Sequence, residues 1–246
     1  MKLNFLLILF ISFSSLFSAE KSRLNNQIMH TKPWGYINEN GEFKGIFVDY
    51  SKELEKRSGI EFERSLAPYA RVWRNLQNGK TDISFLIRSN DRDDIVEYVT
   101  KFITSSSVVV AKKGAKLKSY QDLKTLNIGV VRGVRLSKKF DEDSNLNKKE
   151  FRDYEILFHM FKEGRVDAVA GNIVSILYLA KESGIEDNLG DIYKLETIEA
   201  WVQISKKSKN KQIIPKIEKA AKSIKDDKFL EKTIDTYIGN RWREVL

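Results

Sequence analysis

The stretch LQNGKTDISFLIRSNDR, residues 76–92, decides the fold of this chain. Its Gly-Lys-Thr looks like the end of a phosphate-binding loop, but Arg74 stands where such a loop needs its first glycine. Trp73 and Leu76 instead share one face of a helix that Gly79 ends, and the residues after Asp82 read as a buried strand. The stretch therefore indicates a helix–glycine–strand unit and excludes a nucleotide site of this type.

The same order of features returns in EILFHMFKEGRVDAVAGN, residues 155–172. Leu157 and Phe161 share a helix face, Gly164 ends the helix, and Asp167 precedes a short apolar strand. Strands and helices alternate between the two units. The pattern favours two α/β lobes of related construction over an array of short repeats.

Residues 1–19 have the anatomy of a secretory signal peptide, with a basic start, an apolar block and small residues near Ala19. The apolar block is shorter than the roughly 20 residues that span a bilayer, so cleavage after Ser18 or Ala19 is favoured over a membrane anchor. The chain has no cysteine, which excludes a lipid-modified N-terminus, disulfides and thiolate metal sites. We therefore expect a soluble periplasmic protein.

The formal charge of +9 comes from 43 basic and 34 acidic residues that are interspersed along the chain. The basic run SKKSKNKQ, residues 205–212, contains no aromatic residue for base stacking, so no nucleic-acid partner is expected. The excess charge favours anionic solutes. His30 and His159 lack metal-ligand spacing, and we expect His159 to be packed within its apolar helix. No metal or other cofactor is expected.

Several segments, in this order, carry a family resemblance: PWGYINENGEFKGIFVDYSKELEKRSG (33–59), the stretch 76–92, LNIGVVRGVRLSKKF (126–140) and GRVDAVAGN (164–172). Together they resemble the bacterial extracellular solute-binding proteins of family 3, the polar amino acid type, which feed ABC importers. The resemblance implies an α/β bilobal periplasmic-binding-protein fold of type II, with two lobes joined by two crossover strands near 105–111 and 201–205. Lobe one is then residues 20–106 plus 204–246, and lobe two residues 107–203.

The resemblance also implies a cleft between the lobes that holds a small carboxylate-bearing solute, an amino acid or a related compound. Arg92 matches the family arginine that takes the ligand carboxylate, and a planar guanidinium suits that task. A surface ion pair with Asp91, Asp93 or Asp94 is its structural alternative. Further cleft residues are expected on lobe one, each with core packing or surface exposure as the alternative: Trp34, Tyr36, Tyr69, Arg71, Phe85 and Ile87.

Two positions depart from many amino-acid binders. Gly133 is followed by Val134 and Arg135, where such binders continue with threonines, so a hydroxyl is lost and a cation gained. Asn172 stands where they often carry an aspartate against the ligand's ammonium, and an amide cannot neutralise a buried cation. Arg135 and Asn172 are therefore added to the candidate site, and we expect carboxylates without a fully buried ammonium to be preferred.

The expected role is solute capture by a monomer, with an ABC importer as the partner and no catalytic activity. The same fold leaves two alternatives open. One is a solute-sensing or accessory protein with no importer, and the other is a periplasmic enzyme of the dehydratase type.

Overall fold

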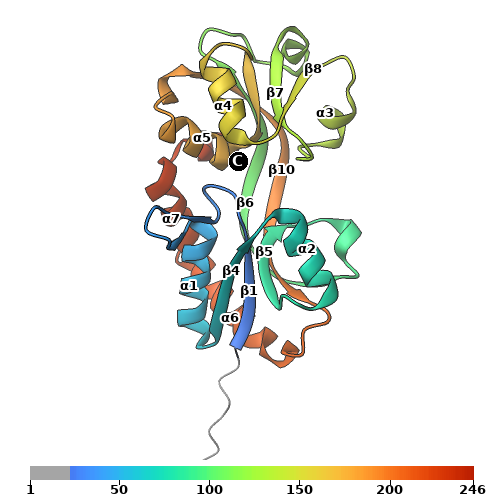
Figure 1. Ribbon diagram of the computed structural model, residues 1–246, viewed down its shortest axis with the longest axis vertical. Coiled ribbons are helices and arrows are strands. Elements are labelled where there is room, and N and C mark those ends of the chain that lie inside the picture. The colour runs from blue at the N-terminus through green and yellow to red at the C-terminus, as the bar shows by residue number, and fades with distance from the viewer. Residues whose placement is uncertain (1–22) are drawn as a thin grey trace, which may run out of the picture.

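Two long antiparallel strands, β6 (Val96–Lys112) and β10 (Leu189–Ser205), run through both lobes of the molecule (Figure 1). The computed structural model describes residues 23–246, and the expected signal peptide, residues 1–19, lies outside them. Within the described residues the strands of both lobes form one sheet in the order β4-β1-β5-β10-β6-β9-β7-β8. The fold is therefore mixed α/β with two lobes, as the sequence predicts.

Lobe one contributes β1 (Arg23–Met29), β4 (Glu61–Ala67), β5 (Ile83–Ile87), the small hairpin β2 (Tyr36–Ile37) and β3 (Phe43–Lys44), and helices α1 (Ile46–Ser58) and α2 (Tyr69–Asn78). Lobe two contributes β7 (Asn127–Val131), β8 (Asn147–Phe151), β9 (Ala168–Asn172), α3 (Lys138–Glu142), α4 (Tyr154–Lys162) and α5 (Ile173–Glu182). The tail adds α6 (Ile214–Asp226) and α7 (Phe229–Ile238). The 3₁₀ helices of the described chain are η1 (Asn90–Arg92), η2 (Tyr120–Thr125), η3 (Glu186–Asn188), η4 (Lys211–Ile213) and η5 (Arg241–Val245).

The parallel strands of each lobe point their carboxyl ends at the other lobe. In lobe one, β5 is antiparallel to β10 and parallel to β1, which is parallel to β4. In lobe two, β9 is antiparallel to β6 and parallel to β7, which is parallel to β8. Because β6 and β10 run in opposite directions between the lobes, the two parallel sets face each other. Ligands of open α/β sheets bind beyond the carboxyl ends of the strands, so the interlobe region is where a site belongs.

The two sequence units have the same local structure, which explains their shared pattern. Gly79 and Gly164 end their helices with positive φ angles of 78° and 69°, a conformation that glycine adopts without strain. Asp82 then accepts the backbone N–H of Asn25 at 2.9 Å, and Asp167 accepts that of Asn127 at 2.8 Å. Each aspartate thus fastens the first strand of its lobe. The Gly-Lys-Thr of residues 79–81 is a helix end.

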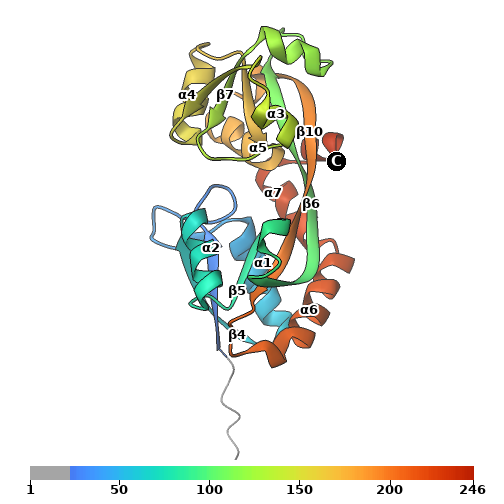
Figure 2. The same ribbon diagram turned by 90° about the vertical axis from the view of Figure 1, so that its right-hand side faces the viewer.

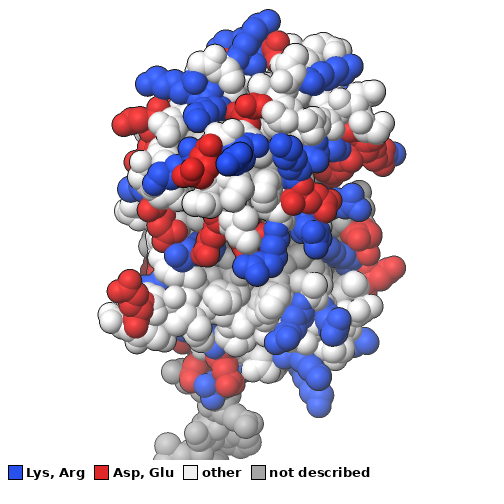
Figure 3. Space-filling view, turned by 45° about the horizontal axis from the view of Figure 1, so that its top comes forward, with Lys and Arg blue, Asp and Glu red and all other residues white. Residues whose placement is uncertain are grey.

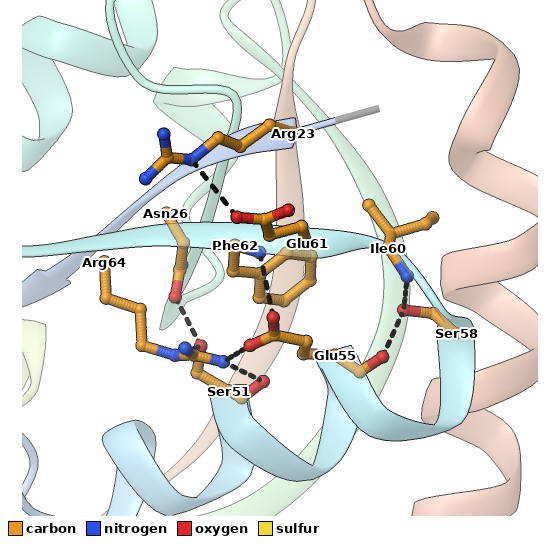
Figure 4. A network of polar contacts seen from close by, with 9 residues as sticks. All are labelled: Arg23, Asn26, Ser51, Glu55, Ser58, Ile60, Glu61, Phe62 and Arg64. Carbon is orange, nitrogen blue, oxygen red and sulfur yellow. Dashed lines mark hydrogen bonds and ion pairs between the residues drawn. The ribbon is translucent and has the colours of Figure 1, made fainter. Parts of the chain in front are cut away.

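Helices cover both faces of lobe one, with α1 and α2 on opposite sides of the sheet (Figures 1 and 2). Helix α1 is fastened to β1 and β4 by a polar network (Figure 4). Ser51 donates to the Asn26 side chain at 2.6 Å and accepts the Arg64 Nε–H at 2.8 Å, while Arg64 also pairs with Glu55. These polar groups satisfy one another, so they fix the helix at little desolvation cost.

The change of lobe occurs in a short two-stranded neck. Ala200 of β10 pairs with both Ile87 and Ile103, and Ser107 of β6 is the first residue that pairs with β9. Between these points, residues 104–106 and 197–199 form strand pairs only with each other among the described residues, and the Glu199 carbonyl in addition accepts the Arg88 N–H at 2.9 Å. Residues 200–203 thus pair with the sheet of lobe one. The return crossover lies at residues 197–199, just before the segment 201–205 in which the sequence places it. No loop marks either border because both strands continue through it.

The C-terminal tail contacts both lobes. Helix α6 packs on α1 of lobe one, whereas α7 contacts α1 and also α5 of lobe two. Arg241 donates to the Gly190 carbonyl at 3.2 Å, and Ser106 at the neck donates to the Val245 carbonyl at 2.5 Å. Figure 2 shows α7 at the level between the lobes. The tail, which the expected division assigns to lobe one, thus also contacts lobe two.

Positive and negative side chains are interspersed over the face of the molecule that Figure 3 draws. Such a surface has no broad field of one sign there. Among residues 23–246, no helix is long and apolar enough to cross a membrane.

Candidate functional site

Arg92 lies just beyond the carboxyl end of β5, in η1, and is held by two aromatic residues from α2. Its Cζ is 3.6 Å from the centroid of the Trp73 ring and 5.5 Å from that of Tyr69. Its Nη1 donates to the Tyr69 hydroxyl at 2.9 Å. The stacked ring and the hydrogen bond fix the guanidinium at the interlobe edge of lobe one.

The acidic neighbours of Arg92 do not neutralise it through a hydrogen-bonded ion pair. The nearest contact is between Arg92 Nε and Asp91 Oδ1 at 3.8 Å, which is too long for a hydrogen bond, and the Asp91 side chain is 73% exposed. Asp93 instead lies 3.9 Å from Arg88. A contact of this length to an exposed carboxylate contributes little, so the charge of Arg92 is available to a ligand.

The turn that carries Arg92 is held by Tyr98 of β6. The Tyr98 hydroxyl donates to the Ser89 carbonyl at 2.7 Å and accepts the Ser89 N–H at 3.3 Å. Burial raises the pKa of Tyr98, so the phenol stays protonated and can donate. The Arg92 N–H donates to the Ser89 carbonyl at 3.2 Å. The position of Arg92 is thus set by β6 as well as by α2.

Trp34 and Tyr36 contact lobe two directly. The Trp34 Nε1–H donates to Ser175 Oγ of α5 at 2.9 Å, and only 6% of Trp34 is exposed. The Tyr36 ring lies 6.4 Å from that of Tyr178, and Lys32 pairs with Glu182 at 2.7 Å. We call these three contacts the interlobe bridge. The expected cleft aromatics are therefore contacts between the lobes in this structure.

Helix α7 packs against the interlobe bridge through Tyr237. The Tyr237 ring lies 6.2 Å from that of Tyr178, and its hydroxyl donates to Asp49 of α1 at 2.9 Å. Burial, with the nearby carboxylates adding to it, raises the pKa values of Tyr178 and Tyr237. Both phenols therefore remain neutral far above physiological pH.

Asn172 caps α5 and is tied to the neck. Its Oδ1 accepts the Val174 N–H at 2.9 Å, and its Nδ2 donates to Ser105 Oγ of β6 at 3.1 Å. The side chain thus has structural partners for both its oxygen and its nitrogen. Arg135 is exposed, two residues after the left-handed turn at Gly133, whose φ is 77°.

The remaining candidates divide into one core residue and three on the surface. Phe85 is fully buried and lies 5.1 Å from the Tyr50 ring, centroid to centroid, so it offers no surface to a solute. The expectation that it lines the cleft is therefore corrected: both faces of β5 are covered, with Phe85 in one hydrophobic cluster and Leu86 in another, so Phe85 packs in the core. Ile87 is 38% exposed and Tyr69 39%, and Arg71 is also exposed. His159 is exposed too and is not packed as expected.

Sequence reasoning missed Trp73, Ser175 and the Lys32–Glu182 pair. Trp73 is identified from its helix pattern as a core residue, which it also is, and no spacing rule joins it to Arg92. The Lys32–Glu182 pair joins residues far apart along the chain, so no local signal announces it.

The chain matches the family described as bacterial extracellular solute-binding proteins, family 3, over residues 28–240. It is 25% identical over 214 residues to the probable amino-acid-binding protein YxeM of Bacillus subtilis, covering 84% of this chain and 80% of that protein. It is 23% identical over 213 residues to the arginine-binding periplasmic protein of Mannheimia haemolytica, covering 85% and 88%.

Solved structures show the same fold. An ancestral cationic amino acid solute-binding protein matches with a TM-score of 0.73 at 21% identity, over 88% of this chain and 96% of that one. A histidine kinase sensor domain with similarity to periplasmic binding proteins also gives 0.73, at 13% identity over 89% and 97%. At these identities the likeness concerns the fold alone.

Proposed function

From its membership of the bacterial extracellular solute-binding proteins of family 3, we infer that this chain captures a small carboxylate-bearing solute between its two lobes, outside the cytoplasm, for an ABC importer. The single observation that supports a carboxylate on the solute is the guanidinium of Arg92, which is stacked on Trp73, bonded to Tyr69 and poorly neutralised by Asp91. A carboxylate accepts two parallel N–H bonds from such a group.

The relatives support an amino acid or a related compound as the solute class. They are named as probable amino-acid-binding, probable histidine-binding, arginine-binding and L-cystine-binding proteins. Each of these solutes carries the carboxylate that Arg92 is proposed to bind. The solute differs among relatives of similar identity, so the side-chain preference must come from residues of this chain.

The proposed preference is for carboxylates without a fully buried ammonium. Asn172 has no negative charge, and its amide is already bonded to Val174 and Ser105. Arg135, exposed beyond the carboxyl end of β7, adds a cation on lobe two. Both features disfavour a buried positive charge on the solute, because a buried cation needs an opposite charge.

A thermal-shift panel tests the proposal on the secreted chain. It contains L-arginine, L-histidine, L-cystine, neutral L-amino acids, dicarboxylates and aromatic acids, and it is run on wild type and on Asn172→Asp. An aspartate caps a helix as well as an asparagine does, and it can accept from the Ser105 hydroxyl where the Asn172 amide donates to it, so the substitution adds a charge and keeps both neighbours. We expect stabilisation by a carboxylate in wild type and a shift toward cationic amino acids in the variant. Tight L-arginine or L-histidine binding by wild type would contradict the preference.

A further inference from the structure

The contact between Arg92 and Trp73 is the shortest cation–aromatic contact among the described residues. The Cζ–centroid distance is 3.6 Å, against 4.6 Å for Arg88 over Tyr98 at the same edge of lobe one. At 3.6 Å the guanidinium lies against the indole in van der Waals contact. An arginine side chain loses much rotamer freedom when it is held this way, and here the loss occurs before any solute binds.

Trp73 has a second unusual feature. It is only 8% exposed and packs with Val72, Leu76 and Leu86, yet its Nε1–H has no hydrogen-bond partner among the described residues. A buried donor without a partner costs free energy that a phenylalanine or a leucine at this place would not. Tryptophan offers the strongest aromatic face for a cation. The contact with Arg92 therefore gives a reason for tryptophan at this position despite the free-energy cost of its unpaired N–H.

We propose that Trp73 is a positioning residue for Arg92, holding the guanidinium ready on lobe one so that a planar carboxylate docks there first. The inference rests on the proposed function, in which Arg92 takes the carboxylate. With one face covered by Trp73 and Nη1 bonded to Tyr69, the guanidinium keeps its other N–H groups for a ligand in its plane. Planar two-oxygen groups fit that edge best.

The alternative is that Trp73 only fills the space between α2 and the sheet. A filler would affect stability but would not affect Arg92 in particular. The chain offers a matched control, because Trp201 lies 5.4 Å from Arg88 in the same kind of contact. Trp201→Leu removes an indole that lies beside Arg88 and against Tyr98, and it leaves the contacts of Arg92 with Trp73 and Tyr69 in place.

The first experiment needs no solute. In ¹⁵N-labelled protein we expect slow rotation about the Arg92 Nε–Cζ bond, seen as separate Nη signals, in wild type and in Trp201→Leu. Trp73→Leu should merge these signals, and Trp73→Phe, which keeps an aromatic face and a filled core, should restore them in part. Free rotation of the Arg92 guanidinium in wild type, or equal order in wild type and a folded Trp73→Leu, overturns the inference.

The second experiment uses acetate, the simplest planar carboxylate, followed at the backbone amides of residues 89–93. Trp73→Leu should weaken acetate binding roughly 2- to 10-fold, because the freed Arg92 side chain must then lose its rotamer freedom on binding. In the Arg92→Ala background the same substitution should add nothing, since Trp73 acts through Arg92. An undiminished effect of Trp73→Leu in that background means that Trp73 is only a filler.

The two experiments separate the inference from the function on which it rests. If Arg92→Ala leaves acetate binding unchanged while the Arg92 signals show restricted rotation, the carboxylate role of Arg92 fails and the restraint by Trp73 stands. If Arg92→Ala abolishes binding and Trp73→Leu changes neither readout, the proposed function stands and the positioning role is wrong.

Discussion

At the scale of single residues, the availability of one charge matters most. The Arg92 side chain is only 21% exposed, but its nearest carboxylate among the described residues, that of Asp91, is 3.8 Å away. A guanidinium in this state gains more from a ligand carboxylate than a fully hydrated lysine would, because less water has to be removed.

Replacing Arg92 should therefore weaken solute binding strongly. Arg92→Ala removes a charge-assisted contact of roughly 1.5–3 kcal/mol, about ten- to 150-fold in affinity. Arg92→Lys should also weaken binding, because an ammonium cannot reproduce the two-pronged contact. Isothermal titration with a solute identified by the thermal-shift panel measures both, and Arg88→Ala is the matched control. Equal losses for Arg88→Ala and Arg92→Ala would assign the effect to general charge.

The sequence predicts these residues to different degrees. Arg92 is identifiable because it follows a strand in a family-like segment, and the structure places it at the interlobe edge. Phe85 lies two residues before the end of the same strand. Its burial depends on the helices that cover both faces of β5 there, and the strand sequence alone does not show where that cover ends. Trp34 is predicted as a cleft aromatic, but its bond to Ser175 joins residues from opposite lobes and has no local pattern.

At the scale of elements, the paired Gly-x-x-Asp units show how one short pattern starts a lobe. Asp82 is 8% exposed and accepts both the Asn25 N–H and the Ser208 hydroxyl, so it joins β1, β5 and the end of β10. Asp167 accepts from both the backbone and the side chain of Asn127. The pattern is legible in the sequence because all its parts are local to one turn.

Asp82→Ala should destabilise the protein by about 1–3 kcal/mol, because the part-buried Asn25 N–H and the buried Ser208 hydroxyl lose their shared acceptor. Urea unfolding followed by circular dichroism measures the loss. Asp94→Ala, at an exposed position of the same lobe, is the control and should leave the midpoint nearly unchanged. Equal midpoints for the two variants would show that Asp82 does not fasten β1.

In the tail, Asp235 of α7 accepts hydrogen bonds from Trp242 and Arg243 of η5, and this contact should be sensitive to acid. Burial of Asp235 opposes its ionisation, but hydrogen bonds from Arg243 and Trp242 outweigh burial and lower its pKa. A lowered folded-state pKa gives stability that is present above the unfolded value of about 3.9 and is lost as pH falls through the lower value. Melting temperatures of wild type and Asp235→Asn should differ at pH 7 and converge in strong acid. A constant difference down to about pH 2 would contradict the assignment.

Element boundaries are harder to predict than the elements themselves. The helix of residues 69–78 and the strand that follows are evident from apolar spacing and a glycine. The neck is not, since β6 and β10 are each 17 residues long and keep their strand character across it. A change of pairing partner leaves no mark in composition.

At the scale of the whole molecule, the lobes are joined by more than two strands. The neck, the interlobe bridge and the α7–η5 tail all connect them. Closure on a solute must therefore bend the neck while the bridge and the tail shift or adapt. A ligand favours closure only through contacts with both lobes.

Weakening the bridge should open the free protein and lower its apparent affinity. Trp34→Phe removes the bond to Ser175 while keeping an aromatic ring against Phe47, and Lys32→Met removes the pair with Glu182. Small-angle scattering of the free double variant should give a larger radius of gyration than wild type, and added solute should compact both. Lys44→Met, in a pair with Glu42 inside lobe one, is the control. An unchanged radius would show that the bridge does not hold the lobes.

The strand order also governs when each lobe can be completed as the chain is made. Lobe two is assembled from one continuous stretch, so its sheet closes as soon as that stretch has emerged. Lobe one begins first, but β5 has no strand partner on one edge until residues 200–204 of β10 have emerged, and α1 lacks its packing partner until α6 has emerged. Lobe one therefore starts to form before lobe two but is completed after it. Until then the unpaired edge of β5 is exposed in the nascent chain, where it is open to mispairing and to chaperone binding.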